Sequence, residues 1–205
     1  MAILSLTAIT AEDIALNPYM AEPLANAVKL GDFELEAPGD NKKIDFPVMP
    51  LKDDMIPVLR FRAASYMPTV CGCNYSIVVT VNGKTLGPIT IAKTSRILGK
   101  EPVFEFKSIY KGRKFPYFGR KNAEICIPYG PDCDAVDNNS ADGVATVLIL
   151  DVSDVLTLSG SNVLSFRNIR NHIDGIPIKV MVRDCEVGYL SKSQIKKMSV
   201  KKGNK

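Results

Sequence analysis

The residue types best suited to ligand binding gather in residues 110–122, YKGRKFPYFGRKN, which are aromatic and basic at once. Flat aromatic faces stack on sugar rings, and Arg or Lys side chains donate hydrogen bonds to hydroxyl and carboxylate oxygens. We therefore predict a carbohydrate-binding site formed by Tyr110, Arg113, Phe115, Tyr117, Phe118 and Arg120. Two alternatives stay open: the Phe rings pack under the loop while the basic residues face water, or the basic residues contact nucleic-acid phosphates.

Catalytic residue types are present, but they form no motif that defines an enzyme. His172 is the only histidine, and a nucleophilic triad needs a base of this kind. The sequence contains neither a G-x-S-x-G motif nor a glycine-rich phosphate loop. Asp and Glu are plentiful, so a carboxylate pair for glycoside cleavage stays an alternative. We predict that the protein is not an enzyme and that His172 is a loop residue.

The five cysteines do not form a zinc-binding pattern. Cys71 and Cys73 have one intervening residue, whereas a CxxC motif has two, and a zinc site needs four convergent ligands. Cys126 and Cys133 flank the short segment IPYGPD, so a loop-closing disulfide is expected if the protein is exported. Because the number of cysteines is odd, at least one thiol stays unpaired in a monomer.

The positive charge of the chain is concentrated near its C-terminal end. The net charge is +4, but six lysines lie within residues 192–205, and the remainder is slightly acidic. A nucleic-acid-binding protein more often carries its basic residues on a structured face, so we expect no nucleic-acid partner. The lysines are typical of a disordered, solubilising tail, and weak contact with an anionic surface is the alternative.

The N-terminal residues 1–13, MAILSLTAITAED, contain a short apolar stretch that ends in small residues. This stretch resembles a signal peptide that lacks its basic n-region, and an ordinary N-terminal segment fits it equally. No apolar run of about 18 residues occurs, so no membrane span is expected. We therefore predict a secreted or extracellular protein.

The elements that must position these residues are β-strands. Residues 144–169 indicate a strand, a polar bridge, a turn at Gly160 to Asn162 and a second strand. Residues 75–81 predict another strand, and Asn82-Gly83 directly after it is the preferred two-residue hairpin turn. Further strands are expected within 32–37, 44–48, 58–67, 84–92, 103–106, 125–127 and 176–187. About eight strands separated by turns favour a β-sandwich or barrel.

Two features of the chain depart from this β pattern. Residues 12–30 have a loose apolar spacing interrupted by two prolines, and a short helix is expected there. Residues 128–143 have little apolar content and predict a long loop.

The strand pattern resembles the galactose-binding-domain-like jelly rolls, the β-sandwich modules found in carbohydrate-binding modules and beside glycoside hydrolases. SIVVTVNGKTLG (76–87), VLILDVSDVLTLSGSNVLSFRN (147–168) and VMVRDCEV (180–187) carry the resemblance. It implies an all-β jelly-roll sandwich of about eight antiparallel strands over residues 31–190, with an N-terminal extension (1–30) and a basic tail (191–205). Because this fold hosts many ligands, the resemblance indicates the architecture better than the function. Within the resembling segment, Gly160 and Asn162 are residue types that suit a structural turn.

The same resemblance implies a structural calcium ion, which in these modules joins an acidic residue near the start of the domain to one near its end. Glu34, Glu36 and Asp184 are the candidate ligands, with Glu186 beside them, and carboxylate oxygens are the ligands that calcium prefers. Alternatively, Glu34 and Glu36 lie on one solvated face, because residues two apart on a strand point the same way. The acids of 132–142 lack the EF-hand spacing.

Together these patterns predict a non-catalytic binding protein or module whose ligand is a carbohydrate. The first alternative is a structural sandwich that meets another protein chain, as a homo-oligomer or a surface assembly. The second is a hydrolase, which would need a carboxylate pair in a concave cleft.

Overall fold

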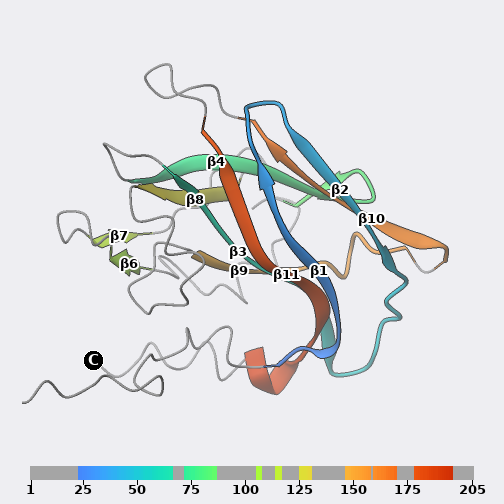
Figure 1. Ribbon diagram of the computed structural model, residues 1–205. Helices are drawn as coiled ribbons and strands as arrows, with labels where there is room; N and C mark the ends of the chain where they lie inside the picture. Colours follow the sequence, from blue (N-terminus) through green and yellow to red (C-terminus); the bar gives the residue numbers. More distant parts are fainter. Residues whose placement is uncertain are drawn as a thin grey trace, which may run out of the picture.

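The computed structural model describes residues 23–66, 72–86, 105–107, 114–116, 125–130, 146–157, 159–169 and 178–195. Within these ranges the chain is almost entirely β-strand (Figure 1). The strands, in chain order, are β1 (Ala25–Leu35), β2 (Asn41–Pro47), β3 (Met55–Tyr66), β4 (Gly72–Val81), β5 (Lys84–Thr85), β6 (Glu105–Lys107), β7 (Lys114–Pro116), β8 (Ile125–Gly130), β9 (Thr146–Asp151), β10 (Ser161–Asn168) and β11 (Val180–Ser191).

The long strands form two four-stranded sheets, in the orders β9-β3-β11-β1 and β8-β4-β10-β2. Every neighbouring pair within a sheet is antiparallel. The pairs are nested, because β1 pairs with β11, β2 with β10, β3 with β9 and β4 with β8. Folding such a nested set of pairs into two layers produces a jelly roll, so the predicted all-β jelly-roll sandwich is confirmed.

Two short connections complete the sheets. The end of β3 also pairs with β8 in parallel, through Ser65 opposite Tyr129 and Tyr66 opposite Gly130, and this contact joins the two sheets at one corner. The two-residue β5 pairs with β4 across the turn that Asn82 and Gly83 form, both at positive φ (52° and 75°). The hairpin turn expected at this Asn-Gly step is therefore confirmed.

The core lies between the two sheets and is filled by alternate residues of each strand. From β3, Leu59, Phe61 and Ala63 point into it, and from β10, Leu164 and Phe166 do so. The ring of Phe166 lies edge-on to Phe61, with centroids 5.0 Å apart and an interplanar angle of 87°. Because inward residues alternate with outward ones along a strand, this core also fixes which side chains face away from it.

The helix expected within residues 12–30 is wrong for the part that the structure describes. Residues 25–30 belong to β1, where Val28 lies opposite Val187 of β11, and residues 12–22 lie outside the described ranges. Pairing with β11 outweighs the weak local helical spacing. The first strand therefore begins before position 31, where the domain was expected to start.

The two ends of the described chain meet at the same end of the sandwich. Residues 192–195 are helical, and the turn begins with a capping box in which Ser191 N donates to Gln194 Oε1 (2.8 Å) and Gln194 N donates to Ser191 Oγ (3.1 Å). Leu24, just before β1, packs with Leu190 in a small apolar cluster that Ile195 also contacts. In the part of the chain that is described, no helix has the length and apolar character needed to cross a membrane.

Candidate functional site

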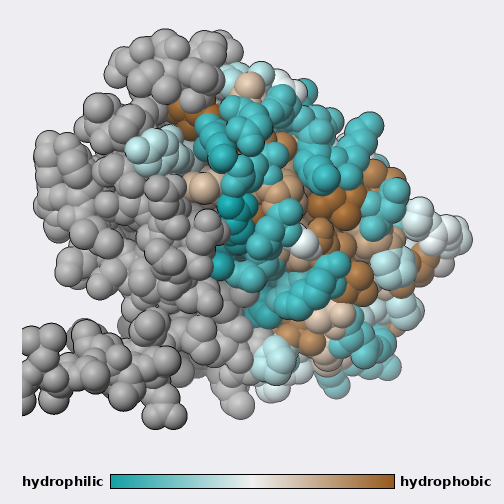
Figure 2. Space-filling view, in the orientation of Figure 1, coloured by the Kyte–Doolittle hydropathy of each residue, from teal (hydrophilic) through white to brown (hydrophobic). Residues whose placement is uncertain are grey.

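The outward side of the β9-β3-β11-β1 sheet carries a cluster of ten charged residues joined by hydrogen bonds and ion pairs, which we call the charged face. They are positioned by the core, because Leu59, Phe61 and Ala63 point inward and leave Arg60 and Arg62 pointing outward. Figure 2 shows hydrophilic residues gathered over the region where β1 and β11 run. The members of the charged face are Lys29, Asp32, Glu34, Glu36, Arg60, Arg62, Lys179, Arg183, Asp184 and Glu186.

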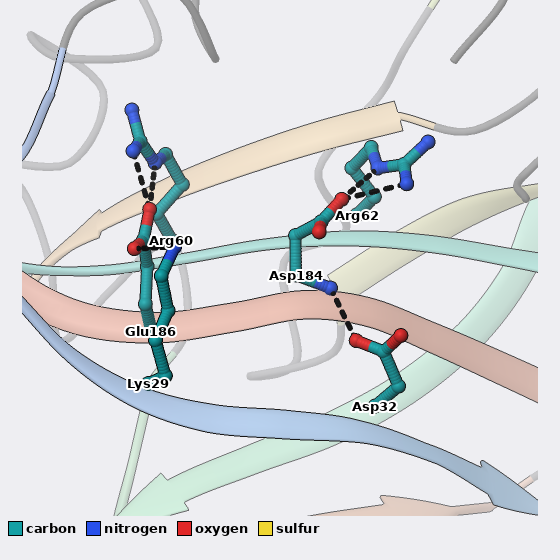
Figure 3. Close-up of polar contacts among 6 residues, drawn as sticks. All are labelled: Lys29, Asp32, Arg60, Arg62, Asp184 and Glu186. Carbon is teal, nitrogen blue, oxygen red and sulfur yellow. Dashed lines mark hydrogen bonds and ion pairs between the residues drawn. The ribbon is translucent and has the colours of Figure 1, made fainter.

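At one end of the charged face, Glu186 of β11 lies between two cations from the neighbouring strands (Figure 3). Arg60 Nε of β3 donates to Glu186 Oε1 at 2.8 Å, and Lys29 Nζ of β1 donates to Glu186 Oε2 at 2.6 Å. Arg60 is 3% exposed and Glu186 is 1% exposed. A charge this deeply buried is tolerated only when it is paired, so each residue depends on the other.

A β-bulge lies next to the Arg60–Glu186 ion pair and places a second ion pair, between Arg62 and Asp184, beside it. The register of β11 against β3 shifts between Arg183 and Glu186, and Asp184 has a positive φ of 51°. The Asp184 side chain accepts a hydrogen bond from Arg62 Nε at 2.6 Å, and its backbone N–H donates to Asp32 Oδ1 at 2.8 Å (Figure 3). A bulged residue lies outside the regular hydrogen-bond ladder, and here the Asp32 carboxylate satisfies its N–H.

A third group of charges joins the end of β1 to the start of β11. Arg183 donates to Glu34 Oε1 at 2.7 Å, and Lys179 pairs with the same carboxylate and, at 3.7 Å, with Glu36. The hydrogen bond from Lys179, followed by that from Arg183, lowers the pKa of the Glu34 carboxyl below its usual value. The Glu34 carboxylate in turn raises the pKa of Lys179.

The charged face therefore contains five basic and five acidic side chains, of which nine form ion pairs with one another and Asp32 accepts the Asp184 N–H. A balanced set of ion pairs has no excess charge with which to attract a charged ligand. Its contacts join β1, β11 and β3 side by side, so the arrangement specifies the register of three strands.

The structure does not gather the residues expected to bind calcium around a common point. Glu34 faces Lys179 and Arg183, whereas Asp184 faces Arg62. Among the residues that are described, no group of three or more His, Cys, Asp or Glu side chains is placed to hold a metal ion. A calcium ion bound by Glu34, Glu36 and Asp184 stays a prediction.

Most of the predicted ligand-binding stretch lies outside the described residues. Tyr110, Arg113, Tyr117, Phe118 and Arg120 all lie there, as do His172, Cys71 and Cys133. The exception is Phe115, whose backbone lies in β7 opposite Phe106 of β6. The predicted carbohydrate site in this stretch therefore stays a prediction.

The outward side of the second sheet differs from the charged face, and we call it the open face. Most residues pointing outward here are partly or fully exposed, as Val163 is at 36%, whereas Ser76 is buried. Among the outward residues that the structure describes on this sheet, none is aromatic, so none offers a ring for stacking on a sugar. The open face comprises Lys43, Asp45, Val78, Thr80, Val163, Ser165 and Arg167.

Hydrogen bonds of two asparagines, Asn82 and Asn162, stabilise the turn between β9 and β10. Asn162 is completely buried, and its Oδ1 accepts hydrogen bonds from Asn82 Nδ2 and from the Thr157 backbone N–H, both at 2.8 Å. Asn82 Oδ1 accepts from the Val163 N–H at 2.9 Å, and Gly160 has the positive φ (77°) expected of the turn. The structural role predicted for Gly160 and Asn162 is confirmed.

The one cysteine whose side chain is described, Cys185 on β11, is a free and fully buried thiol. Burial raises the pKa of this thiol far above its usual value, so the nucleophilic thiolate is suppressed. Cys185 is therefore a core residue.

Comparisons with protein-family models, with curated proteins and with solved structures return no match for this chain. Its class consequently rests on the strand order, which defines an all-β jelly-roll sandwich.

Proposed function

We propose that this protein is a non-catalytic binding module of the galactose-binding-domain-like type and that its ligand is a carbohydrate. The observation that carries the non-catalytic part is the structural use of the acidic residues on the charged face. Glu186, Asp184 and Glu34 are each held by Arg or Lys side chains at hydrogen-bonding distance. A general acid or base must instead reach a substrate proton, which favours binding over cleavage.

The proposed ligand site is the stretch that contains Tyr110, Arg113, Phe115, Tyr117, Phe118 and Arg120. Its support comes from residue chemistry, since rings for stacking and guanidinium groups for hydrogen bonding occur together. Arg113 and Arg120 favour a glycan that carries carboxylates, such as a uronic-acid polysaccharide.

Affinity electrophoresis of the whole chain, in gels containing neutral or uronic-acid polysaccharides, tests the proposal. We expect retardation by the acidic polymers, weakened in Tyr117→Ala and in Arg120→Ala. Tyr66→Ala is the matched control, because Tyr66 is a 41% exposed tyrosine at the end of β3, apart from this stretch in the sequence. Folded protein that migrates unretarded in every gel would contradict the proposal.

The second candidate is a homo-oligomer that forms through the open face. The observation that favours it is the exposure of Val163, an apolar residue that is 36% exposed on the outward side of β10. Light scattering gives the mass in solution, and an oligomer that Val163→Lys dissociates would support this candidate. Asp53→Asn, on an exposed loop, changes the net charge equally and is the control. A monomeric wild-type protein would exclude it.

A further inference from the structure

Asn82 and Gly83 form the only Asn-Gly step in the sequence. Asn followed by Gly is the sequence most prone to deamidation, because glycine has no side chain to block attack by its own backbone nitrogen. In that reaction the Gly83 nitrogen bonds to Asn82 Cγ and loses its proton, while the Cγ–Nδ2 bond breaks and ammonia leaves. Water then opens the resulting succinimide ring at either carbonyl, giving aspartate or isoaspartate. The net change consumes one water and releases one ammonia.

The folded protein holds every polar atom of the Asn82 side-chain amide. Its Nδ2, the leaving nitrogen, donates to the Val155 carbonyl at 2.9 Å and to Asn162 Oδ1 at 2.8 Å. Its Oδ1 accepts from the Val163 N–H at 2.9 Å. The Asn82 backbone N–H also donates to the Val163 carbonyl at 2.8 Å. Rotation of the amide toward the Gly83 nitrogen would break these contacts, which come from two separate parts of the chain.

We propose that Asn82 is a deamidation site and that its native hydrogen bonds prevent the reaction in the folded protein. Deamidation then proceeds when the segment around Val155 to Val163 opens. The reaction rate then reports the opening of this corner of the sandwich. Local opening of this kind has its own free energy, separate from that of global unfolding.

The product would not fit the site that the amide leaves. An aspartate at position 82 directs a carboxylate oxygen at the Val155 carbonyl and at Asn162 Oδ1, so that acceptors face acceptors. An isoaspartate adds a main-chain carbon to a two-residue turn that depends on positive φ at both positions. Conversion therefore loosens the corner and cannot be reversed by refolding.

The direct test follows wild-type protein at neutral pH in increasing urea. Peptide mapping by mass spectrometry measures the fraction of Asn82 converted to aspartate or isoaspartate over time. We expect the folded protein to react at least roughly tenfold more slowly than the unfolded chain, because opening must precede reaction. Equal rates in the folded and unfolded protein would overturn the proposal, and this comparison needs no variant to fold.

A pair of variants locates the effect. Asn162→Ala removes one acceptor of the Asn82 amide, whereas Asn168→Ala removes an equally buried asparagine that bonds Tyr75 and Ile178 instead. At urea concentrations that give equal global stability, we expect several-fold faster conversion of Asn82 in Asn162→Ala than in Asn168→Ala. Equal rates of Asn82 deamidation in the two variants would show that the Asn82–Asn162 hydrogen bond does not protect Asn82.

Discussion

Arg60 and Glu186 form an ion pair between β3 and β11 that is almost completely buried on the side of the sheet away from the core. The two residues are 126 positions apart in the sequence. They lie opposite each other because the bulge at Asp184 adds a residue to β11 just before Glu186. The bulge and the ion pair therefore specify one register for the two strands.

Removing Glu186 should destabilise the protein strongly. In Glu186→Ala the Arg60 guanidinium stays buried without its carboxylate, which typically costs about 3–5 kcal/mol. Urea unfolding monitored by circular dichroism measures this loss. Replacing both residues together, as Arg60→Met with Glu186→Leu, should recover much of it, because no buried charge is then left unpaired.

The control for this prediction is an exposed ion pair. Lys192 and Asp54 pair at 3.2 Å with side chains that are mostly in solvent, so Lys192→Ala should change stability by less than about 1 kcal/mol. If Glu186→Ala were as mild as Lys192→Ala, the buried pair would not have the role assigned to it.

The buried Asn162 should contribute more to stability than an exposed asparagine. Asn162→Ala leaves the Thr157 N–H and the Asn82 amide without their shared acceptor, at a cost of about 1–3 kcal/mol. Asn41 is the matched control, since it accepts one hydrogen bond from Ser165 at an exposed position. Asn41→Ala should fall within about 0.5 kcal/mol of the wild type in the same urea titration. Equal losses in the two variants would contradict the assigned role of Asn162.

The ion pairs of Glu34 give the stability a defined dependence on acidity. The pKa of Glu34 is lower in the folded protein than its ordinary value of 4.5, so folded Glu34 binds its proton more weakly than unfolded Glu34. Its contribution is therefore fully present above pH 4.5 and is lost as the pH falls toward and through the folded pKa. Urea unfolding of wild type and Glu34→Gln across this range should show a difference that shrinks with acidification. A constant difference would contradict this linkage.

The thiol of Cys185 should be unreactive while the protein is folded. Burial raises its pKa and separates it from reagents in solution, so alkylation at neutral pH should be much slower than in the unfolded chain. Mass spectrometry of the peptide that contains Cys185 distinguishes it from the other cysteines. Rapid alkylation of Cys185 in native protein would show that β11 opens readily.

Local sequence was sufficient to predict features that depend on neighbouring residues. The Asn82-Gly83 turn and the Gly160 turn were predicted correctly, because positive φ is a property of those residues themselves. The alternation of Leu59 and Phe61 with Arg60 and Arg62 in the sequence likewise matches the inward and outward sides of β3 in the structure.

Features that depend on the register between strands could not be predicted from local sequence. The sequence contains Arg60 and Glu186 but does not reveal the bulge that places them opposite each other. It likewise contains Asp32 and Asp184 but does not reveal that the Asp32 carboxylate accepts the Asp184 N–H. The calcium prediction considered the acidic residues alone, and the structure adds the cations that pair with them. Lys179, just before β11, and Arg183, within β11, pair with Glu34 and were the available sequence signal for these ion pairs.

The most direct test of the proposed function is the affinity of the whole chain for a uronic-acid oligosaccharide, measured by calorimetric titration. We expect saturable binding that Tyr117→Ala weakens by roughly 1–3 kcal/mol, the range expected for the loss of one stacking ring with its surrounding contacts, while Tyr66→Ala binds as the wild type does. Absence of binding by folded protein, or equal affinity in Tyr117→Ala and Tyr66→Ala, would contradict the proposal that residues 110–120 recognise a carbohydrate.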